Sequence, residues 1–420
     1  MTFDRWPQPE TLRAAPDYTI GQLQAAMAEG QILTGQAVHC DAALNLHIRL
    51  GALSGIMPRG ECVAPFLSGA QREIAVLSCV GRGVCCRVTG QRTAPNGDTE
   101  LLLSRRLAQE EAMDYIEAHA EPGLVIPGLA ENLIPQGMDQ CDETGILYIS
   151  GYYTTDGKSS AILAVDTATG ELTAEYILLN AGGTPFDGHV GGVAVSEDTL
   201  YVSGQKQNGL YTICAIPLKD LPAEGSHEVK LEQTIPVPVS PSFLSCSHGY
   251  LWVGNFYHPG ADYPLSDGMK YTTASADGED YGCYIMGYDL SKGSLSVADG
   301  DDYAQPDLVL VGPNKIQGVV VGEDDTVTLS QSYGRKNNAS LLRYSLALGE
   351  TLDTMLTVQG RDVPGYILDS KRLKESVTAM PMTEALADAK DGGIYVLFES
   401  GAIHYANGTF RTDHVWKIKF

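Results

Sequence analysis

Five stretches of the chain repeat one pattern, which is two short strands around a tight turn. In each copy a short apolar strand follows a small or polar residue. A turn rich in Asp, Gly or Ser comes next, and a strand of β-branched and aromatic residues ends the copy. Self-similar units of this size are typical of repeat architectures. The five copies are residues 135–153, 190–206, 241–258, 316–334 and 382–402.

Further strands complete the repeats and predict a mainly β fold. Third strands are expected within residues 159–172, 209–221, 282–295 and 340–352. Fourth strands follow, such as residues 173–179 and 229–237. Four antiparallel strands per unit predict a five-bladed β-propeller. The fifth copy reaches only a third strand, residues 414–420, so we expect residues 123–129 to pair with it and close the ring through the propeller's two ends.

The first 120 residues follow a different pattern. Residues 20–30 have apolar side chains at helical spacing and end at Gly30, which predicts a short amphipathic helix. Ser104 is a plausible N-cap for a second helix over residues 104–120. Short strands with Gly-rich corners between the two helices predict a small closed barrel. We therefore expect two domains, residues 1–120 and 121–420. The four strand-like stretches are residues 32–41, 44–58, 73–90 and 99–105.

The charge of the chain limits its partners. Of the 420 residues, 28 are Lys or Arg and 52 are Asp or Glu, a formal net charge of −24. Residues 1–120 hold 10 Arg and 13 carboxylates, so residues 121–420 hold 18 basic and 39 acidic residues and carry most of the excess. Such a surface repels phosphate, which disfavours DNA and anionic membranes as partners.

Other composition signals are weak. The nine cysteines form no C-x-x-C pair, so we expect reduced, mostly buried thiols and no zinc site. Cys85 and Cys86 are adjacent, which on a strand directs them to opposite faces. No apolar run has the length of a signal peptide or a membrane span, so we expect a cytoplasmic protein. No phosphate-binding glycine motif is present, so no nucleotide cofactor is expected, and any other cofactor stays unknown.

The order of stretches in residues 20–117 resembles the S1-like domain of the OB-fold family, most specifically in "HIRLGALSGIMPRGE". The resemblance implies RNA binding by bases stacked on aromatic side chains beside basic residues. Here the matching strands carry Leu44, Leu46, His47 and Ile48, with no Phe, Tyr or Trp among them. A barrel used for macromolecular contact is therefore favoured over an RNA-binding barrel. The basic residues left as weak nucleic-acid candidates are Arg49, Arg59, Arg72, Arg82 and Arg87.

The propeller also resembles a known group. "IPQGMD", "GHVGG" and "PMTEALADAKDGGIYVLFESGA" are similar to bacterial five-bladed propellers without an established reaction, over nearly all of residues 124–420. The resemblance implies the fold and transfers no site residue.

A site is expected where the blades converge. In a hairpin the start of the first strand and the end of the second are neighbours, so both lie on one rim of the disc, at the mouth of its central channel. The aligned first-strand positions are Gln136, Gly191, Ser242, Gln317 and Glu384. Small residues next to them are explained by crowding around the axis. The candidate ligand-binding residues on this rim are Gln136, Tyr152, His189, Gln205, Asn255, Tyr257, His258, Gln317, Tyr333, Glu384 and Glu399.

The chemistry of this rim has several interpretations. His189 and Glu384 could act as a base and its orienting carboxylate, and Asp187, His189 and His258 could bind a metal, although no spacing is diagnostic. Glu384 and Glu399 would suit glycoside chemistry if about 5–9 Å apart. The candidate catalytic residues are thus His189, Glu384 and Glu399, without a motif that identifies a reaction.

Three function classes remain open. A binding or scaffold protein is favoured, with a small polar, peptide or saccharide ligand on the rim, because the rim is rich in polar and aromatic groups and has no recognisable catalytic set. The rim aromatics suit stacking on a sugar. A hydrolase or lyase acting at the channel mouth is the first alternative. An RNA-associated protein acting through the S1-like barrel is the second.

Overall fold

The computed structural model describes most of the chain, in two compact units. The first unit contains Met1–His119 and the second most of Ala120–Phe420, except that Asn338–Leu341 and Glu375–Met380 group with the first. No helix among the described residues is long and apolar enough to span a membrane. The described residues are 17–51, 53–62, 83–94, 97–108, 120–155, 157–260, 263–266, 268–335, 337–346, 352–406 and 411–420, with isolated positions between 73 and 81 and Glu110.

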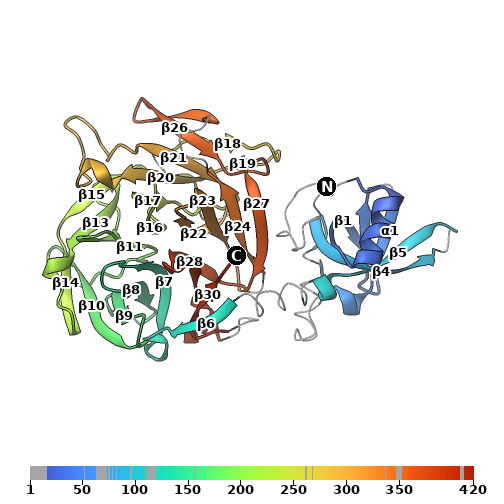
Figure 1. The fold of residues 1–420 in the computed structure, drawn as a ribbon, viewed down its shortest axis with the longest axis horizontal. Coiled ribbons are helices and arrows are strands. Elements are labelled where there is room, and N and C mark those ends of the chain that lie inside the picture. The colour runs from blue at the N-terminus through green and yellow to red at the C-terminus, as the bar shows by residue number, and fades with distance from the viewer. Residues whose placement is uncertain are drawn as a thin grey trace. The chain divides into compact units, whose positions relative to one another are not determined.

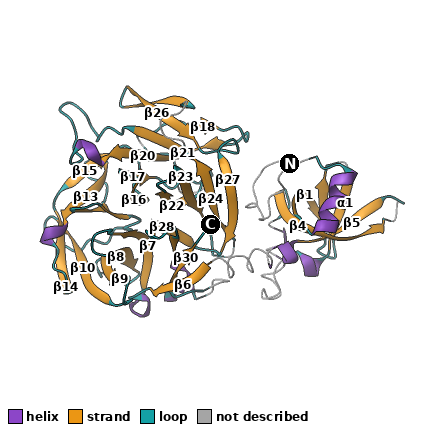
Figure 2. Cartoon of the chain, viewed as in Figure 1, coloured by secondary structure: helices purple, strands orange, loops and turns teal. Residues whose placement is uncertain are grey.

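The N-terminal unit contains a closed five-stranded barrel with one helix packed on it (Figure 2). Helix α1 (Ile20–Glu29) starts at a capping box between Thr19 and Gln22 and ends at Gly30, whose φ of +65° is the left-handed conformation that glycine adopts readily. The strand order around the barrel is β1-β2-β3-β5-β4, in which β3 and β5 are parallel. The strands are β1 (Ile32–Cys40), β2 (Leu46–Leu50), β3 (Leu53–Met57), β4 (Gly83–Thr93) and β5 (Thr99–Ser104).

The sequence predicted this barrel with one strand too few. Residues 44–58 form the hairpin β2–β3, because Gly51 with a φ of +71° allows a tight turn. The predicted strand over residues 73–90 is shorter at its start, since β4 begins at Gly83. Cys85 and Cys86 do face opposite sides, and both are buried. The second predicted helix is described only at its start, where the Ser104 hydroxyl accepts a hydrogen bond from the N–H of Leu107.

The second unit, together with Asn338–Leu341 and Glu375–Met380, forms a five-bladed propeller (Figure 1). Blade 1 contains β7 (Leu133–Gln140), β8 (Ile146–Tyr153), β9 (Ala161–Asp166) and β10 (Leu172–Asn180). Blade 2 contains β11 (Val193–Val195), β12 (Thr199–Ser203), β13 (Tyr211–Pro217) and β15 (Thr234–Val237). Blade 3 contains β16 (Phe243–Ser247), β17 (Tyr250–Gly254), β20 (Cys283–Asp289) and β21 (Leu308–Gly312). Blade 4 contains β22 (Ile316–Val321), β23 (Thr326–Gln331), β24 (Ala339–Ser345) and β27 (Leu373–Ala379). Blade 5 contains β28 (Thr383–Asp388), β29 (Ile394–Phe398), β30 (His414–Ile418) and β6 (Ala120–Val125).

The ring closes as predicted, through the two ends of the propeller chain. Strand β6 pairs antiparallel with β30, with Ala120 opposite Ile418 and Val125 opposite His414. The pairing strand starts three residues before the predicted range of 123–129 and ends at Val125. Because β6 is the outermost strand of blade 5, the last blade is held by residues that precede the first one.

Two pairs of neighbouring blades are joined by strands that the repeat pattern did not predict. Strand β14 (Gly225–Leu231) lies between β13 and β15 in sequence but pairs in parallel with β10 of blade 1. The predicted fourth strand over residues 229–237 was therefore too long: Thr234–Val237 is the fourth strand of blade 2, whereas residues 229–231 belong to β14. The hairpin β25 (Thr354–Val358)–β26 (Arg361–Ile367) leaves blade 4 in the same way and pairs in parallel with β21 of blade 3. A two-stranded ladder, β18 (Thr273–Ala274) with β19 (Asp280–Tyr281), is inserted in blade 3.

The inner strands β7, β11, β16, β22 and β28 adjoin one another in a ring, and small residues allow this approach. A Cβ on Gly137 would lie 2.6 Å from the backbone nitrogen of Val193, and one on Gly192 would lie 2.4 Å from that of Leu244. Where the inner residue is Phe243, the opposite residue on β17 is Gly254, and a Cβ there would lie 2.1 Å from the Phe243 ring. The glycines beside His189 thus have the structural role that the sequence predicted.

Polar side chains tie the inner ring together. The buried Asp139 carboxylate on β7 accepts hydrogen bonds from the backbone N–H groups of Val195 in blade 2 (3.0 Å) and Cys246 in blade 3 (2.9 Å). The hydroxyl groups of Ser150, Ser203 and Ser330 each donate to a carbonyl of the following blade. All nine cysteines lie in the described part of the chain, none of them forms a disulfide, and seven are buried, as expected.

Candidate functional site

Three of the five aligned rim positions are β-bulges. The pairing register shifts across Gln136 in β7, across Gln317 in β22 and around Glu384 in β28. A bulge leaves its extra residue outside the regular ladder and changes the direction of its side chain. Lys315 and Met382 precede two of these bulges with φ values of +71° and +68°, a left-handed conformation that is unfavourable for side chains of this size.

The three bulge residues meet in one hydrogen-bonded network with Glu399. Gln136 Nε2 donates to Glu399 Oε2 at 3.0 Å, and Gln317 Nε2 donates to Glu384 Oε1 at 3.2 Å. The two carboxyl groups are hydrogen-bonded to each other, so one of them carries a proton in this contact. The network therefore joins blades 1, 5 and 4 around the axis.

The carboxyl pair holds a proton near neutral pH. Burial raises the pKa of Glu399 to about 7, although hydrogen bonds from Tyr405 and Gln136 counteract the effect. Burial raises the pKa of Glu384 well above its usual range, and the charge of Glu399 adds to the shift. Two buried carboxylates in contact cannot both ionise at low cost. The pair is consequently both a hydrogen-bond donor and an acceptor.

Aromatic and basic side chains continue the network outward. The Tyr405 hydroxyl is hydrogen-bonded to Glu399 and to the hydroxyl of Tyr152. The His189 ring meets the Tyr152 ring edge-on, with 4.3 Å between centroids, and the Arg335 guanidinium lies 4.6 Å from the centroid of the Tyr405 ring. His189 is solvent-accessible, but neighbouring atoms desolvate it and lower its pKa. We call this set the rim cluster: Gln136, Tyr152, His189, Gln317, Arg335, Glu384, Glu399 and Tyr405.

Blades 3 and 4 add aromatic rings to the rim. Tyr333 lies 4.3 Å from His258 and 6.2 Å from Phe256, measured between ring centroids. Phe256 also meets Tyr263 edge-on at 4.9 Å. Tyr263 in turn is close enough to Tyr152 to affect its pKa electrostatically. Every blade thus contributes an aromatic side chain, counting His189 for blade 2.

Three predicted ligand-binding residues have structural partners instead. The buried Asn255 amide donates to the carbonyl of Gly282 (3.0 Å) and accepts from the N–H of Tyr284 (2.8 Å), so it holds blade 3 together. The Tyr257 ring packs against Gly282, where a Cβ would lie 2.3 Å from it. Gln205 donates to Asp187 at 3.1 Å.

Two of the chemical interpretations do not agree with this geometry. No three His, Cys, Asp or Glu side chains among the described residues are placed to hold a metal ion, which contradicts a site at Asp187, His189 and His258. Glu384 and Glu399 are in hydrogen-bond contact, closer than the separation of about 5 Å or more that glycoside hydrolysis needs. His189 contacts Tyr152, and its link to Glu384 passes through Tyr405 and Glu399.

The sequence did not single out Arg335 or Tyr405. Tyr405 lies in the single-turn helix η6 (Ile403–Tyr405) and Arg335 in a loop, so neither belongs to a strand of the repeat. The nearest signal was position: both follow the second strand of a blade, as the predicted rim residues do.

The candidate nucleic-acid residues of the barrel are only partly described. Arg59 is paired with Glu73 at 3.0 Å, and the Arg87 guanidinium lies against Gly30 at the end of α1. Arg49 is exposed on β2. Arg72 and Arg82 lie outside the described residues. Two of the three described arginines are therefore engaged within the unit.

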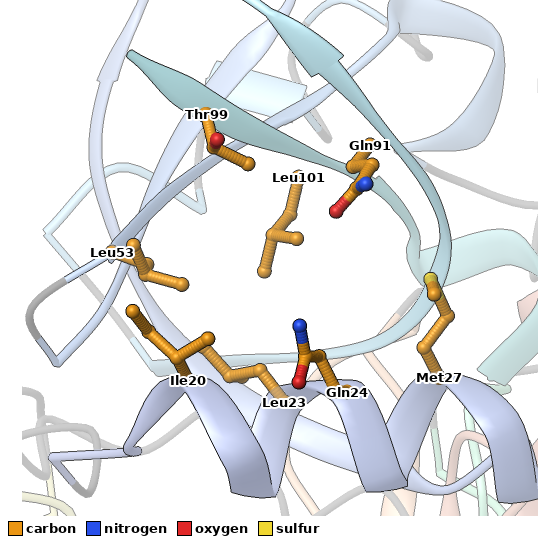
Figure 3. Close-up of a pocket in the computed structure, with 8 residues that line it drawn as sticks. All are labelled: Ile20, Leu23, Gln24, Met27, Leu53, Gln91, Thr99 and Leu101. Atoms are coloured by element: carbon orange, nitrogen blue, oxygen red, sulfur yellow. The ribbon is translucent and has the colours of Figure 1, made fainter.

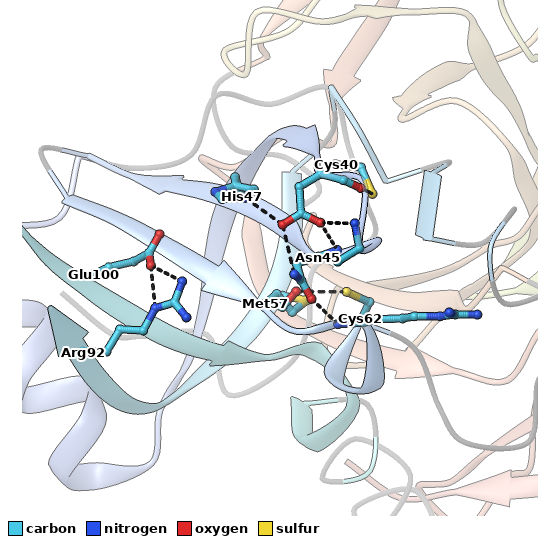
Figure 4. Close-up of polar contacts among 10 residues, drawn as sticks. Cys40, Asn45, His47, Met57, Cys62, Arg92 and Glu100 are labelled. Carbon is cyan, nitrogen blue, oxygen red and sulfur yellow. Dashed lines mark hydrogen bonds and ion pairs between the residues drawn. The ribbon is translucent and has the colours of Figure 1, made fainter. Parts of the chain in front are cut away.

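Polar contacts fix one side of this barrel (Figure 4). The Asp41 carboxylate accepts from the N–H groups of Ala43 and Asn45 and lies 3.4 Å from His47 Nε2. These hydrogen bonds lower the pKa of Asp41 to about 2. The His47 ring is stacked on His39 with 4.1 Å between centroids, so its role in the strand pair is structural.

A cavity of about 260 Å³ lies in the N-terminal unit (Figure 3). Helix α1 forms one wall, and β3, β4 and β5 contribute the facing side chains. None of the residues that the sequence predicted for a site lines it. The lining residues are Ile20, Leu23, Gln24, Met27, Leu53, Gln91, Thr99 and Leu101.

Comparisons with known proteins show similarity to solved structures alone. No protein-family model and no curated protein sequence matches the chain. A solved structure of the PQQ-bound aldose sugar dehydrogenase from Streptomyces coelicolor is 13% identical with a TM-score of 0.40, covering 71% of this chain and 96% of that one. The tail fiber of Staphylococcus aureus phage P68 is 9% identical with a TM-score of 0.36, and the match covers 73% of this chain and 55% of the tail fiber chain. A glucose dehydrogenase is 11% identical with a TM-score of 0.35, and the match covers 72% of this chain and 99% of the dehydrogenase chain. Similarity at these TM-scores carries no argument about the function of this chain.

Proposed function

We propose that the rim cluster binds a small polyhydroxylated ligand of the saccharide class, and that the protein is a binding protein. The observation that supports this most strongly is the network Gln136–Glu399–Glu384–Gln317, which comes from three blades and has three of its four residues at bulges. Bulges next to a site commonly redirect side chains toward it.

The chemistry of the cluster suits sugar hydroxyl groups. Each hydroxyl both donates and accepts hydrogen bonds, and the glutamine amides and the half-protonated carboxyl pair also do both. The exposed face of Tyr333 and the half-buried Tyr152 supply apolar surface against which a sugar ring can pack.

Binding is favoured over hydrolysis for a geometric reason. The two carboxyl groups contact each other, so no space for an attacking water or a sugar carbon lies between them in this arrangement. An acid–base role would require the pair to separate first.

We propose for the N-terminal unit an S1-like OB-fold barrel that contacts another macromolecule, with residues 1–120 and 121–420 as the two domains. The strand order β1-β2-β3-β5-β4 of a closed five-stranded Greek-key barrel supports the assignment.

The test is a saccharide screen with matched variants. The full chain is screened against a panel of oligosaccharides by saturation-transfer NMR, and hits are measured by calorimetry. Glu399→Gln and Gln136→Ala should each weaken binding by about tenfold or more, the cost of one good hydrogen bond to a buried charged group. Glu323→Gln removes the same charge at a side chain that is 89% exposed, and should leave affinity unchanged. Equal affinity in all four proteins would contradict a rim site.

A further inference from the structure

Each blade contributes an aromatic side chain to the rim, and two of these side chains connect to the carboxyl pair through hydrogen bonds. Blade 1 contributes Tyr152, blade 2 His189, blade 3 Tyr263, blade 4 Tyr333 and blade 5 Tyr405. The Tyr152 and Tyr405 hydroxyl groups are hydrogen-bonded to each other, and the Tyr405 hydroxyl is hydrogen-bonded to Glu399. Aromatic faces carry partial negative charge and attract cations, most strongly when the cation is desolvated.

The protein already places its own cations on these rings. Arg335 lies 4.6 Å from the centroid of the Tyr405 ring, and Lys315 Nζ lies 5.8 Å from that of Tyr333. Both contacts are within the range of cation–π attraction. The electrostatic character of the rim therefore favours positive groups.

The carboxyl pair strengthens this preference. Glu384 is 4% exposed, so its charge interactions are little screened by water. The groups that face the pair are the two glutamine amides, the Tyr405 hydroxyl, more distantly Tyr152, and one cation, Arg335. A second cation at the pair would let both carboxyl groups ionise and release their shared proton to solvent. The formal net charge of −24 also steers cations toward the protein.

We propose that the ligand of the rim cluster is an amine-bearing sugar, whose protonated amino group binds at Glu384 and Glu399 and displaces their shared proton. This inference rests on the proposed saccharide-binding function and specifies the class of saccharide. The ligand ammonium keeps its protons and donates N–H hydrogen bonds, while the proton of the carboxyl pair goes to the buffer, so charge and atoms balance without any covalent step.

The experiment compares three disaccharides that differ only at the 2-position of each ring. They are the β-1,4 disaccharide of glucosamine, its N-acetylated form and cellobiose, measured by calorimetry with the full chain at about pH 6.5, below the ordinary pKa of an amino group. The glucosamine disaccharide should bind about tenfold or more tightly than the other two. Its binding enthalpy should differ between buffers of different ionisation enthalpy, by an amount that corresponds to at least one released proton, because Glu399 with a pKa of about 7 is itself partly protonated at pH 6.5.

Variants separate the role of the carboxyl pair from general charge effects. Glu399→Gln should remove both the amine preference and the proton release, whereas Glu323→Gln should retain them. Arg335→Gln changes an exposed side chain and should tighten amine binding, because it removes the competing cation.

The outcomes distinguish this inference from the proposed function. If cellobiose or the N-acetylated disaccharide binds as tightly as the amine form, the rim still binds saccharides but the amine inference is wrong. If Arg335→Gln weakens binding, the ligand uses the arginine and the inference is also wrong. If none of these sugars, and no other sugar of the panel, binds, both proposals fail.

Discussion

Gln136 donates a 3.0 Å hydrogen bond to Glu399, although the two residues lie 263 positions apart in the chain. Blade 1 and blade 5 therefore meet at this bond on the rim, while β6 joins the two ends of the propeller at its periphery. The same closure that completes the fold thus assembles the candidate site.

The first prediction concerns the pH dependence of stability. The pKa of Glu399 is raised to about 7 in the folded protein, so the folded state holds a proton that the unfolded state releases near its ordinary value of 4.5. Stability from this proton is complete below about pH 4.5 and is lost as the pH rises to about 7. Relative to Glu399→Gln, the wild type should lose about 1–3 kcal/mol of unfolding free energy across this window, measured by urea denaturation. If the difference in unfolding free energy between the wild type and Glu399→Gln stayed constant with pH, the raised pKa of Glu399 would be contradicted.

The second prediction concerns Asp139, which joins three blades. Asp139→Asn replaces one accepting oxygen by an NH₂ group, so a buried backbone N–H of Val195, Cys246 or Gln140 loses its partner. The expected cost is about 1–3 kcal/mol in chemical denaturation. Asp142→Asn, at a side chain that is 65% exposed and paired with Lys390, should cost less than about 1 kcal/mol. A similar cost for both variants would mean that the Asp139 contacts contribute little.

The third prediction concerns the Phe243–Gly254 pair. Gly254→Ala places a methyl group 2.1 Å from the Phe243 ring and should destabilise the protein by about 1–3 kcal/mol. In a Phe243→Val background, which removes the ring, Gly254→Ala should be less destabilising, by about 1 kcal/mol or more. The four proteins form a double-mutant cycle, and strictly additive effects would show that the crowding is relieved elsewhere.

The fourth prediction concerns ring closure. A chain that starts at residue 120 retains β6, whereas a chain that starts at residue 127 leaves β30 as an exposed edge. The shorter chain should unfold at a melting temperature lower by about 10 °C or more, because blade 5 loses its outermost strand. Equal melting temperatures would show that the pairing of the two ends does not hold the propeller closed.

The sequence predicted the fold well because the repeat is local. Each hairpin such as β7–β8 is encoded by alternating residues and a turn, so aligning copies placed Gln136, Gln317 and Glu384 at one level of the ring. The parallel additions of β14 and β25–β26 to neighbouring blades were missed because long-range pairing leaves no periodic signal.

The sequence grouped residues of the candidate site by their position in the repeat and did not predict the contacts between them. Alignment placed both Glu384 and Glu399 on the rim, but their direct contact depends on the bulge in β28, which changes the direction of one side chain. Asn255 was predicted as a ligand-binding residue because its position in the repeat is equivalent to that of the other predicted rim residues. In the structure its amide is hydrogen-bonded to the backbone of blade 3. Tyr405 and Arg335 lie outside the repeated strands, where the pattern has no information.

The most direct measurement is a crystal structure of the full chain with the disaccharide that binds most tightly. The proposed function predicts electron density for the sugar within about 3.5 Å of polar atoms of Gln136, Gln317 or Glu399, beside the Tyr152 ring. Density only elsewhere, for example in the cavity lined by Leu53 and Leu101, would contradict it.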